Sequence, residues 1–320
     1  MSVPKLHGPA WAAVRIHRAA LWTGLALVVV SAGFLGVLRG WLVSANAGNN
    51  CDTDIGASGC HDYQSAGDWL SGTTYVDSKA LLIVPFLVGA FVAGPAIARE
   101  LESRTHLLAW SQSVPPARWL AAKLALAALT ATALSLALMG ALQLGRTDAD
   151  GFSTWGLDWS ERGAYEATGP ALVAYCLLAV AVGALTGLLV RRTVAAMAVS
   201  GLVTGAVLLA LGSVRWDLLP TRTTTGKTYG NDLDDLFVNV GPAQDVYVTD
   251  SGALNSLGQR FHPGECGYRC PADDKVTGWY SDYHPRSHFW YIQFIETGIV
   301  LALAALAVYA AFRVLRRRTA

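Results

Sequence analysis

Six apolar segments decide what this chain can fold into. A helix needs roughly 20 apolar residues to cross the hydrocarbon core of a bilayer, and each segment is close to that length. The 320-residue chain is 53% hydrophobic with a mean hydropathy of +0.37, which leaves room for sizeable polar loops. We predict an all-α integral membrane protein, a single transmembrane domain over 1–320 with six transmembrane helices. The expected spans are about 21–38, 80–98, 119–142, 169–190, 193–212 and 289–312.

Charged residues divide sharply between two sets of connecting segments. The N-terminal arm, the segment after the second span, the Arg191–Arg192 turn and the C-terminal tail carry 13 Lys and Arg but only two acidic residues. Loops 39–79, 145–168 and 213–288 carry 11 basic and 20 acidic residues. Lys and Arg concentrate on the cytoplasmic side of membrane proteins. We therefore predict cytoplasmic termini and three outer loops in a multi-pass protein of the plasma membrane.

The segment between the second and third spans is polar and rich in helix-forming residues. It reads GPAIARELESRTHLLAWSQSVPPARWLAAK over 94–123. Leu and Thr recur at helical spacing in it, and Glu100 lies four residues before Arg104, a favourable helix pair. Pro115 and Pro116 should stop this helix. We expect a short cytoplasmic helix over 99–114 joining two spans.

This segment closely resembles the loop between the second and third spans of actinobacterial type-2 ABC transporter permeases. Members read approximately A-R-E-x-E-x-x-T-H-x-x-A-W-[TS]-Q-x-V-x-x-x-R-W-x-x-x-K there, and the double proline is a departure from that pattern. VRIHRAALW near the start and HPRSHFWYIQFIETG near the end resemble the same group. The matching residues are Arg99, Glu100, Glu102, Thr105, His106, Ala109, Trp110, Ser111, Gln112, Val114, Arg118, Trp119 and Lys123.

The resemblance implies the permease subunit of an ABC exporter, driven by ATP that a separate ATPase subunit hydrolyses. It also implies a dimeric transmembrane unit, either a homodimer or a paired permease, among membrane lipids. By the same resemblance, the segment 99–118 would couple the chain to its ATPase. The candidate coupling residues are Arg99, Glu100, Glu102, Thr105, His106, Trp110 and Gln112.

We expect no catalysis and no cofactor in this chain itself. Thr225–Thr228 has the GKT ending of a phosphate-binding loop, but Thr221 stands where that motif requires glycine. The spans contain no Ser-His-Asp, H-E-x-x-H or paired-acid pattern. No strongly basic domain suggests nucleic-acid binding.

An acidic residue inside an apolar span needs an explanation, because burying a charge in the bilayer is costly. Glu296 lies about two turns into the last span, with Gln293 three residues earlier on the same helix face. These two residues could line a substrate path or hold a neighbouring helix by hydrogen bonds. Alternatively, Glu296 is shallow enough to reach water at the headgroups.

Four of the five cysteines lie in loops expected outside the cell, where disulfides form. They allow three pairings, of which Cys51–Cys60 with Cys266–Cys270 is the simplest. We expect the fifth, Cys176, to be a packed free thiol in the fourth span.

A zinc site is the alternative for the second cysteine pair. Cys266-x3-Cys270-x13-His284-x3-His288 falls within zinc-finger spacing. Pro285 stands between the histidines, where a finger requires helix, so we favour the disulfide.

Two other classes of function remain as alternatives. An ion-coupled secondary transporter would explain Glu296, but such proteins usually contain internal repeats, which this sequence lacks. A membrane sensor with a ligand-binding outer loop would explain 213–288, but the cytoplasmic segments are short for a signalling output.

Overall fold

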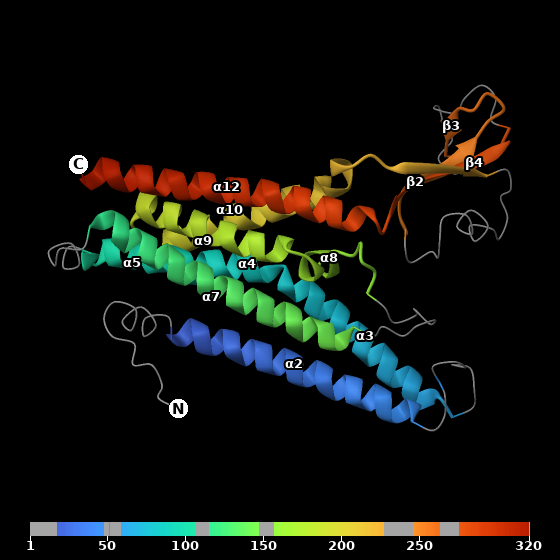
Figure 1. Cartoon of the computed structure of the whole chain (residues 1–320), viewed down its shortest axis with the longest axis horizontal. Helices are drawn as coiled ribbons and strands as arrows, with labels where there is room; N and C mark the ends of the chain where they lie inside the picture. The colour runs from blue at the N-terminus through green and yellow to red at the C-terminus, as the bar shows by residue number, and fades with distance from the viewer. Residues whose placement is uncertain are drawn as a thin grey trace. The chain divides into compact units, whose positions relative to one another are not determined.

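The structure is a computed structural model with two compact units, each described by itself (Figure 1). The helical unit comprises Met1–Leu157, Glu161–Gly212 and Glu296–Ala320, and the sheet unit comprises Asp158–Ser160 and Ser213–Ile295. The structure describes residues 18–47, 51, 59–106, 115–146, 157–226, 246–262 and 275–319.

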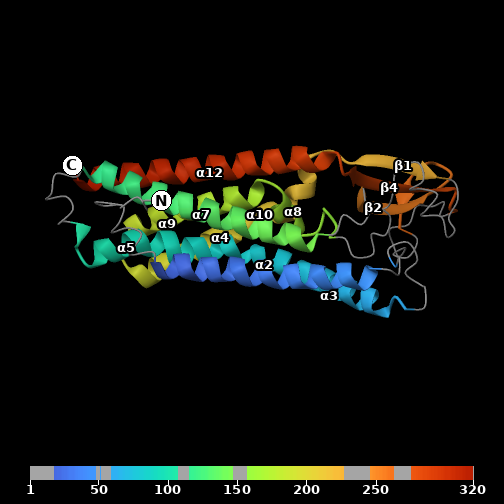
Figure 2. The ribbon, with the colours of Figure 1, turned by 60° about the horizontal axis from the view of Figure 1, so that its bottom comes forward.

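Six helices in the described residues are long and apolar enough to cross a membrane, which confirms the predicted fold class. Five are single α-helices, and the second span is built from four consecutive segments (Figures 1 and 2). The single helices are α2 (Arg18–Asn46), α7 (Pro116–Gly145), α9 (Ala171–Val190), α10 (Thr193–Val214) and α12 (His288–Thr319). The second span consists of α3 (His61–Leu81), α4 (Ile83–Leu87), the π-helix η1 (Val88–Ala93) and α5 (Gly94–Glu102).

Prolines account for the interruptions of the second span. Pro85 and Pro95 have no N–H group, so each removes one backbone hydrogen bond from the helix. Between them η1 widens into a π turn, in which the N–H of Gly94 donates to the carbonyl of Gly89, five residues earlier. Single π turns inside α-helices are rare, and those that do occur are often found at functional sites.

Two glycines of α9 allow this interrupted span to pack closely against it. A Cβ atom added at Gly183 would lie 2.5 Å from Cβ of Ala93, and one added at Gly187 would lie 3.2 Å from the backbone nitrogen of Ala98. Small residues of this kind let helices approach in a membrane. Gly183 and Gly187 therefore serve ordinary helix packing.

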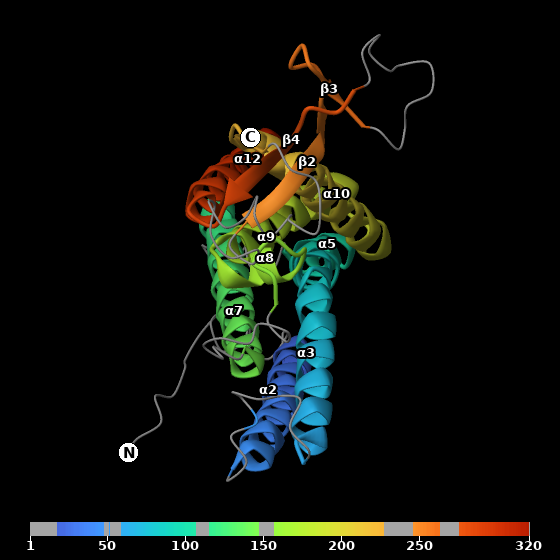
Figure 3. The ribbon, with the colours of Figure 1, turned by 90° about the vertical axis from the view of Figure 1, so that its right-hand side faces the viewer.

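The structure corrects the expectation of a loop over the whole of 39–79. Helix α2 continues to Asn46, and α3 begins at His61. The two helices lie side by side (Figure 3). The sequence analysis placed residues 61–79 in a loop because their polar residues lower the hydropathy. They nevertheless pack as an amphipathic helix. The buried face of this hairpin consists of Leu35, Leu38, Leu42, Tyr63, Ala66 and Leu70.

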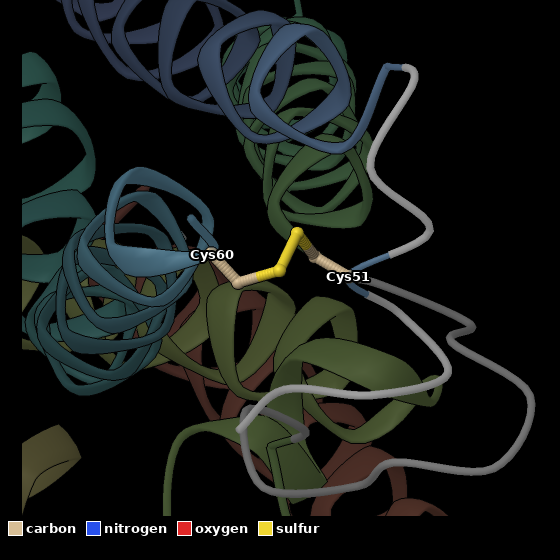
Figure 4. The surroundings of a disulfide bond; sticks show 2 residues. All are labelled: Cys51 and Cys60. Atoms are coloured by element: carbon tan, nitrogen blue, oxygen red, sulfur yellow. A yellow bond between two sulfur atoms is a disulfide. The ribbon is translucent and has the colours of Figure 1, made fainter. Parts of the chain in front are cut away.

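A disulfide closes the loop between the two helices of this hairpin. Cys51 and Cys60 are bonded, with Cα atoms 5.6 Å apart (Figure 4). Both cysteines belong to the same buried cluster as the hairpin face. In the chain-entropy model, a bond closing so short a loop stabilises the fold by about 2–3 kcal/mol. Cys266 and Cys270 lie outside the described residues, and Cys176 is a buried free cysteine, as expected.

Part of the expected outer loop 213–288 forms a four-stranded antiparallel sheet, which the sequence did not predict. Its order is β1-β4-β2-β3, with a register shift between Val248 and Asp250. The strands are β1 (Arg222–Gly226), β2 (Val246–Leu254), β3 (Arg260–Phe261) and β4 (Gly278–Pro285). Two short helices, α8 (Ala164–Thr168) and η3 (Arg215–Leu218), complete the described elements.

Polar cross-strand contacts stabilise one face of this sheet. Arg260 Nη1 donates to Asp282 Oδ2 at 2.6 Å, and the hydroxyl of Tyr280 donates to Asp250 Oδ2 at 3.0 Å. His262 Nε2 lies 3.0 Å from the other oxygen of Asp250. Burial alone would raise the pKa of Asp250, but its bonds from His262 and Tyr280 outweigh burial and lower that pKa. Such pairs favour one strand register over its alternatives.

Candidate coupling site at the end of α5

The segments expected in the cytoplasm meet at one end of the helical unit. Here the C-terminal ends of α5, α9 and α12 pack against the first turns of α7 (Figure 2). Arg318 donates to the carbonyl of Leu188, which links α12 to α9. The apolar contacts at this end involve Ile97, Trp119, Leu120, Ala184, Leu188, Ala311 and Leu315.

Helix α5 is shorter than the sequence analysis predicted. It ends at Glu102, and Arg104 adopts a left-handed backbone conformation with φ of 58°. A continuous helix from Arg99 to Val114 is therefore wrong. The expected pair of Glu100 with Arg104 is also wrong, because Arg104 lies in the turn and Glu100 bonds elsewhere.

Glu100 connects α5 to α7 through both carboxylate oxygens. Its Oε1 accepts a hydrogen bond from Lys123 Nζ at 2.6 Å, and its Oε2 accepts one from Trp119 Nε1 at 3.0 Å. Lys123 Nζ also reaches the carbonyl of Ala96 at 3.3 Å. The side chains of Glu100 and Lys123 are only 24% and 18% exposed, so water screens this ion pair weakly. We call this arrangement the Glu100 clamp.

Glu102 connects α5 to α10 in a different way. Its Oε2 accepts hydrogen bonds from the backbone N–H of Thr193 at 2.9 Å and from Thr193 Oγ1 at 2.6 Å. Thr193 is the first residue of α10, where backbone N–H groups lack intrahelical acceptors. A carboxylate is favourable at this positive end of the helix dipole. Glu102 thus caps α10 from a neighbouring helix.

The remaining candidate coupling residues are placed unevenly. Arg99 and Thr105 are exposed, and Thr105 Oγ1 lies 3.0 Å from Ser103 Oγ. His106 Nδ1 lies 3.0 Å from the carbonyl of Glu100, so this ring nitrogen is the donor. Trp110 and Gln112 lie outside the described residues.

Sequence reasoning did not assign roles to the partners of the two glutamates. Trp119 and Lys123 stand in the matching motif, and that was the available signal. Thr193 follows the Arg191–Arg192 turn and begins α10. A threonine at the start of a helix is a typical capping signal, and it could have pointed to a polar contact there. None of the three was predicted to contact α5.

The second polar site lies between α9 and α12. The hydroxyl of Tyr175 donates to Glu296 Oε1 at 2.6 Å, and Glu296 is fully buried within the chain. Gln293, one turn earlier on α12, is also fully buried. This geometry agrees with the reading in which Glu296 holds a neighbouring helix. Tyr175 was missed because a tyrosine in an apolar span gives no sequence signal of its own.

The histidines of the zinc alternative bond to each other and to a backbone carbonyl. His284 Nε2 donates to the carbonyl of Trp216 at 3.0 Å, and its Nδ1 lies 3.1 Å from Nδ1 of His288. Burial lowers the pKa of His284, which favours the neutral ring. No group of three or more His, Cys, Asp or Glu suited to a metal occurs among the described residues, a set that excludes Cys266 and Cys270.

A family model described as "ABC-2 membrane transporter related" matches residues 22–215. The chain belongs to the ABC-2 membrane transporter related family. The matched region runs from α2 into η3 and includes the Glu100 clamp and the Glu102 cap. No curated protein and no solved structure matches the chain significantly. Together with six apolar helices, membership in this family makes the chain a multi-pass membrane component of ABC transporter type.

We predict that the Glu100 clamp stabilises this ABC-2 family member measurably. A double-mutant cycle of Glu100→Ala and Lys123→Ala should give a coupling energy of about 1–2 kcal/mol, because the pair is largely shielded from water. Reversible unfolding in detergent measures it. The control is Lys79–Glu161, whose side chains are 33% and 42% exposed, with expected coupling below about 1 kcal/mol. Equal coupling in the two pairs would contradict the prediction.

We also predict that Tyr175→Phe lowers stability by about 1–3 kcal/mol, because it removes a donor from a buried carboxyl group. The apparent Tm in detergent measures the loss. Tyr309→Phe, on an exposed side chain of α12, is the control and should leave Tm unchanged. If both variants behave alike, the Tyr175–Glu296 bond does not hold the helices together.

Proposed function

We propose that this chain is the transmembrane permease subunit of an ATP-driven ABC exporter in the plasma membrane. A separate ATPase subunit binds and hydrolyses ATP, and the segment 99–118 couples that subunit to the spans. The observation that carries the proposal is the pair of polar connections at the end of α5. Glu100 bonds to α7 and Glu102 bonds to α10, so the end of the second span is attached to two other spans.

These connections give the coupling segment a mechanical route into the membrane. A displacement of the turn at residues 103–105 pulls directly on α5, whose carboxylates hold α7 and α10. Side-chain hydrogen bonds of 2.6–3.0 Å keep the three helix ends together. The π turn and the two prolines of the second span lie farther along the same helix and give it places to bend. ATP-driven movement at one end would therefore change how the spans pack.

Two copies of the permease, or one copy with a paired permease, form the complete transmembrane unit in this proposal. Both termini lie in the cytoplasm, because the basic residues gather at the end of the helical unit that carries the coupling segment. The exposed apolar side chains of α2, α10 and α12 contact membrane lipids. Family membership supports the ATPase partner, and the resemblance of the coupling motif supports the direction of export.

The topology predicts opposite locations for two reporters. A fusion after Ala320 should report the cytoplasm, whereas a reporter inserted within 145–168 should report the outside. The measurement uses two reporters, a fluorescent protein that is active in the cytoplasm and an alkaline phosphatase that is active outside it. Two positions on the same side of the membrane would exclude the six-span arrangement.

The coupling segment predicts two distinguishable defects. Trp110→Ala should lower co-purification of the ATPase about tenfold or more, since truncating an aromatic interface residue typically costs about 2 kcal/mol. Glu102→Ala should retain the ATPase but lower permease-dependent ATP hydrolysis, because it cuts the connection to α10 and leaves Trp110 in place. Both are measured on complexes purified from membranes.

Glu161→Ala is the matched control. It removes another carboxylate in an ion pair, that with Lys79, remote from the coupling segment in sequence. It should leave docking and hydrolysis unchanged after normal insertion. If Trp110→Ala and alanine replacement of the whole 99–114 segment both leave ATPase binding at the wild-type level, the coupling proposal is wrong.

A further inference from the structure

An apolar groove opens on the helical unit between α2, η1 and α7. Its volume is about 350 Å³, at the small end of the range typical of small-molecule sites. Thr130 is the one polar side chain in its lining, and the Thr130 hydroxyl already donates to the carbonyl of Ala127 at 3.0 Å. A molecule that fills the groove therefore meets hydrocarbon walls. The lining includes Gly24 and Val28 of α2, Val88 and Val92 of η1, and Ala133 of α7.

A carboxylate lies one helical turn beyond one end of this groove. Asp77 Oδ2 accepts a hydrogen bond from Ser31 Oγ at 2.7 Å. Ser31 follows Val28 of the groove lining by three residues, so the two side chains are neighbours on one face of α2. The groove and the carboxylate therefore adjoin, and one elongated molecule can contact both.

Asp77 lacks a charged partner where it needs one. Ser31 is near the middle of Trp22–Asn46, the apolar stretch of α2, so the half-buried Asp77 lies level with that stretch. A carboxylate in apolar surroundings is costly unless a cation pairs with it. Among the described residues Asp77 forms no ion pair, and the nearest basic residue in sequence, Lys79, pairs with Glu161 at 2.7 Å. Asp77 is therefore open to a cation from a ligand.

We propose that the groove and Asp77 together bind an amphiphile with an alkyl chain and a positively charged amine. The chain lies in the groove, and the ammonium group donates to the Asp77 carboxylate. The Ser31 hydroxyl occupies Oδ2 and leaves Oδ1 for the ammonium group. Hydrogen bonds between two charged groups are stronger than neutral ones, so the site discriminates by charge as well as by length. The inference rests on the proposed function in one respect, because it makes this amphiphile the exported cargo.

Photo-labelling of the full chain in vesicles tests the chemistry of the ligand. The probe is dodecylamine with a diazirine on its alkyl chain, and the vesicles are made of phosphatidylglycerol, which has no amine. Labelled peptides should come from α2, η1 and α7. Unlabelled dodecylamine should compete about tenfold better than dodecanol, because only the amine pairs with the carboxylate. Equal competition by the two would overturn the proposal.

Vesicles of phosphatidylethanolamine separate two sources of the same chemistry. If labelling disappears in them, an amine-bearing membrane lipid occupies the site. If labelling persists, the ligand is a free amphiphile. Either result requires a site that takes an alkyl chain together with an amine.

Asp77→Asn tests the carboxylate. It should weaken binding of the probe about tenfold, the equivalent of about 1.4 kcal/mol, and Asp77→Glu should restore part of the loss. Asp62→Asn makes the same change at an exposed carboxylate in the first turn of α3, and it should leave binding unchanged. If Asp77→Asn lowers Tm but binds the probe like the wild type, Asp77 serves only to hold α3 against α2 and the proposal is wrong.

Ala133→Trp tests the groove without altering Asp77. The indole should fill the space beside α2 and η1 and exclude the alkyl chain, which should remove most of the labelling. Leu136→Trp is the matched control, because Leu136 is on the same helix, is 54% exposed and lies outside the groove lining. It should be labelled like the wild type. Equal labelling of the two tryptophan variants would exclude the groove as the site.

These binding measurements need no ATPase, so they are independent of the proposed function. If the ATPase co-purifies but Asp77→Asn and Ala133→Trp are labelled like the wild type, the site is wrong and the permease function stands. If the probe binds as expected but no ATPase associates with the chain, the site stands and the proposed function fails.

Discussion

Two carboxylates in the last turn of α5 link the helices at the basic end of the helical unit. Glu100 bonds to α7, and Glu102 bonds to the first residue of α10. These acidic residues are surrounded in sequence by arginines and lysines that would repel one another if left alone at one end of a bundle. The glutamates neutralise part of this positive charge, and their hydrogen bonds join neighbouring helices. The contacts of α5 with α7 and α10 depend on this arrangement.

The sequence predicted the six membrane helices and the family because both are signalled by long stretches of residues. Apolar length identified six helices, and the motif within 99–123 pointed to the family that the residues 22–215 match. Neither signal depends on where a helix is interrupted or on the exact residue at which it ends. The prediction failed where a helix is only half apolar, as in 61–79, which packs one face against α2 and leaves polar residues on the other.

Pairwise contacts could not be read from the sequence for a different reason. Glu100 has basic neighbours at Arg99 and Arg104, so local spacing favoured the wrong partner. The true partner, Lys123, lies on another helix, and it became available because the chain turns at Arg104. The sheet was missed similarly, since its strands are short and pair across long intervening segments. Tyr175 and Glu296 are 121 positions apart and meet only through helix packing.

The π turn in the second span has a consequence for sequence length. A π turn accommodates one residue more than an α-helical turn does. Deleting one residue between Val88 and Ala93 would return the segment to α-helix and leave the helical phase of the following residues nearly unchanged. Deleting one residue from the regular turns of α5 before Glu100 would instead rotate everything after it by about 100°. Glu100 and Glu102 would then point away from Lys123 and Thr193, while the apolar length of the span would hardly change. The helical phase of this span, and not only its length, therefore determines whether its two ends can act together.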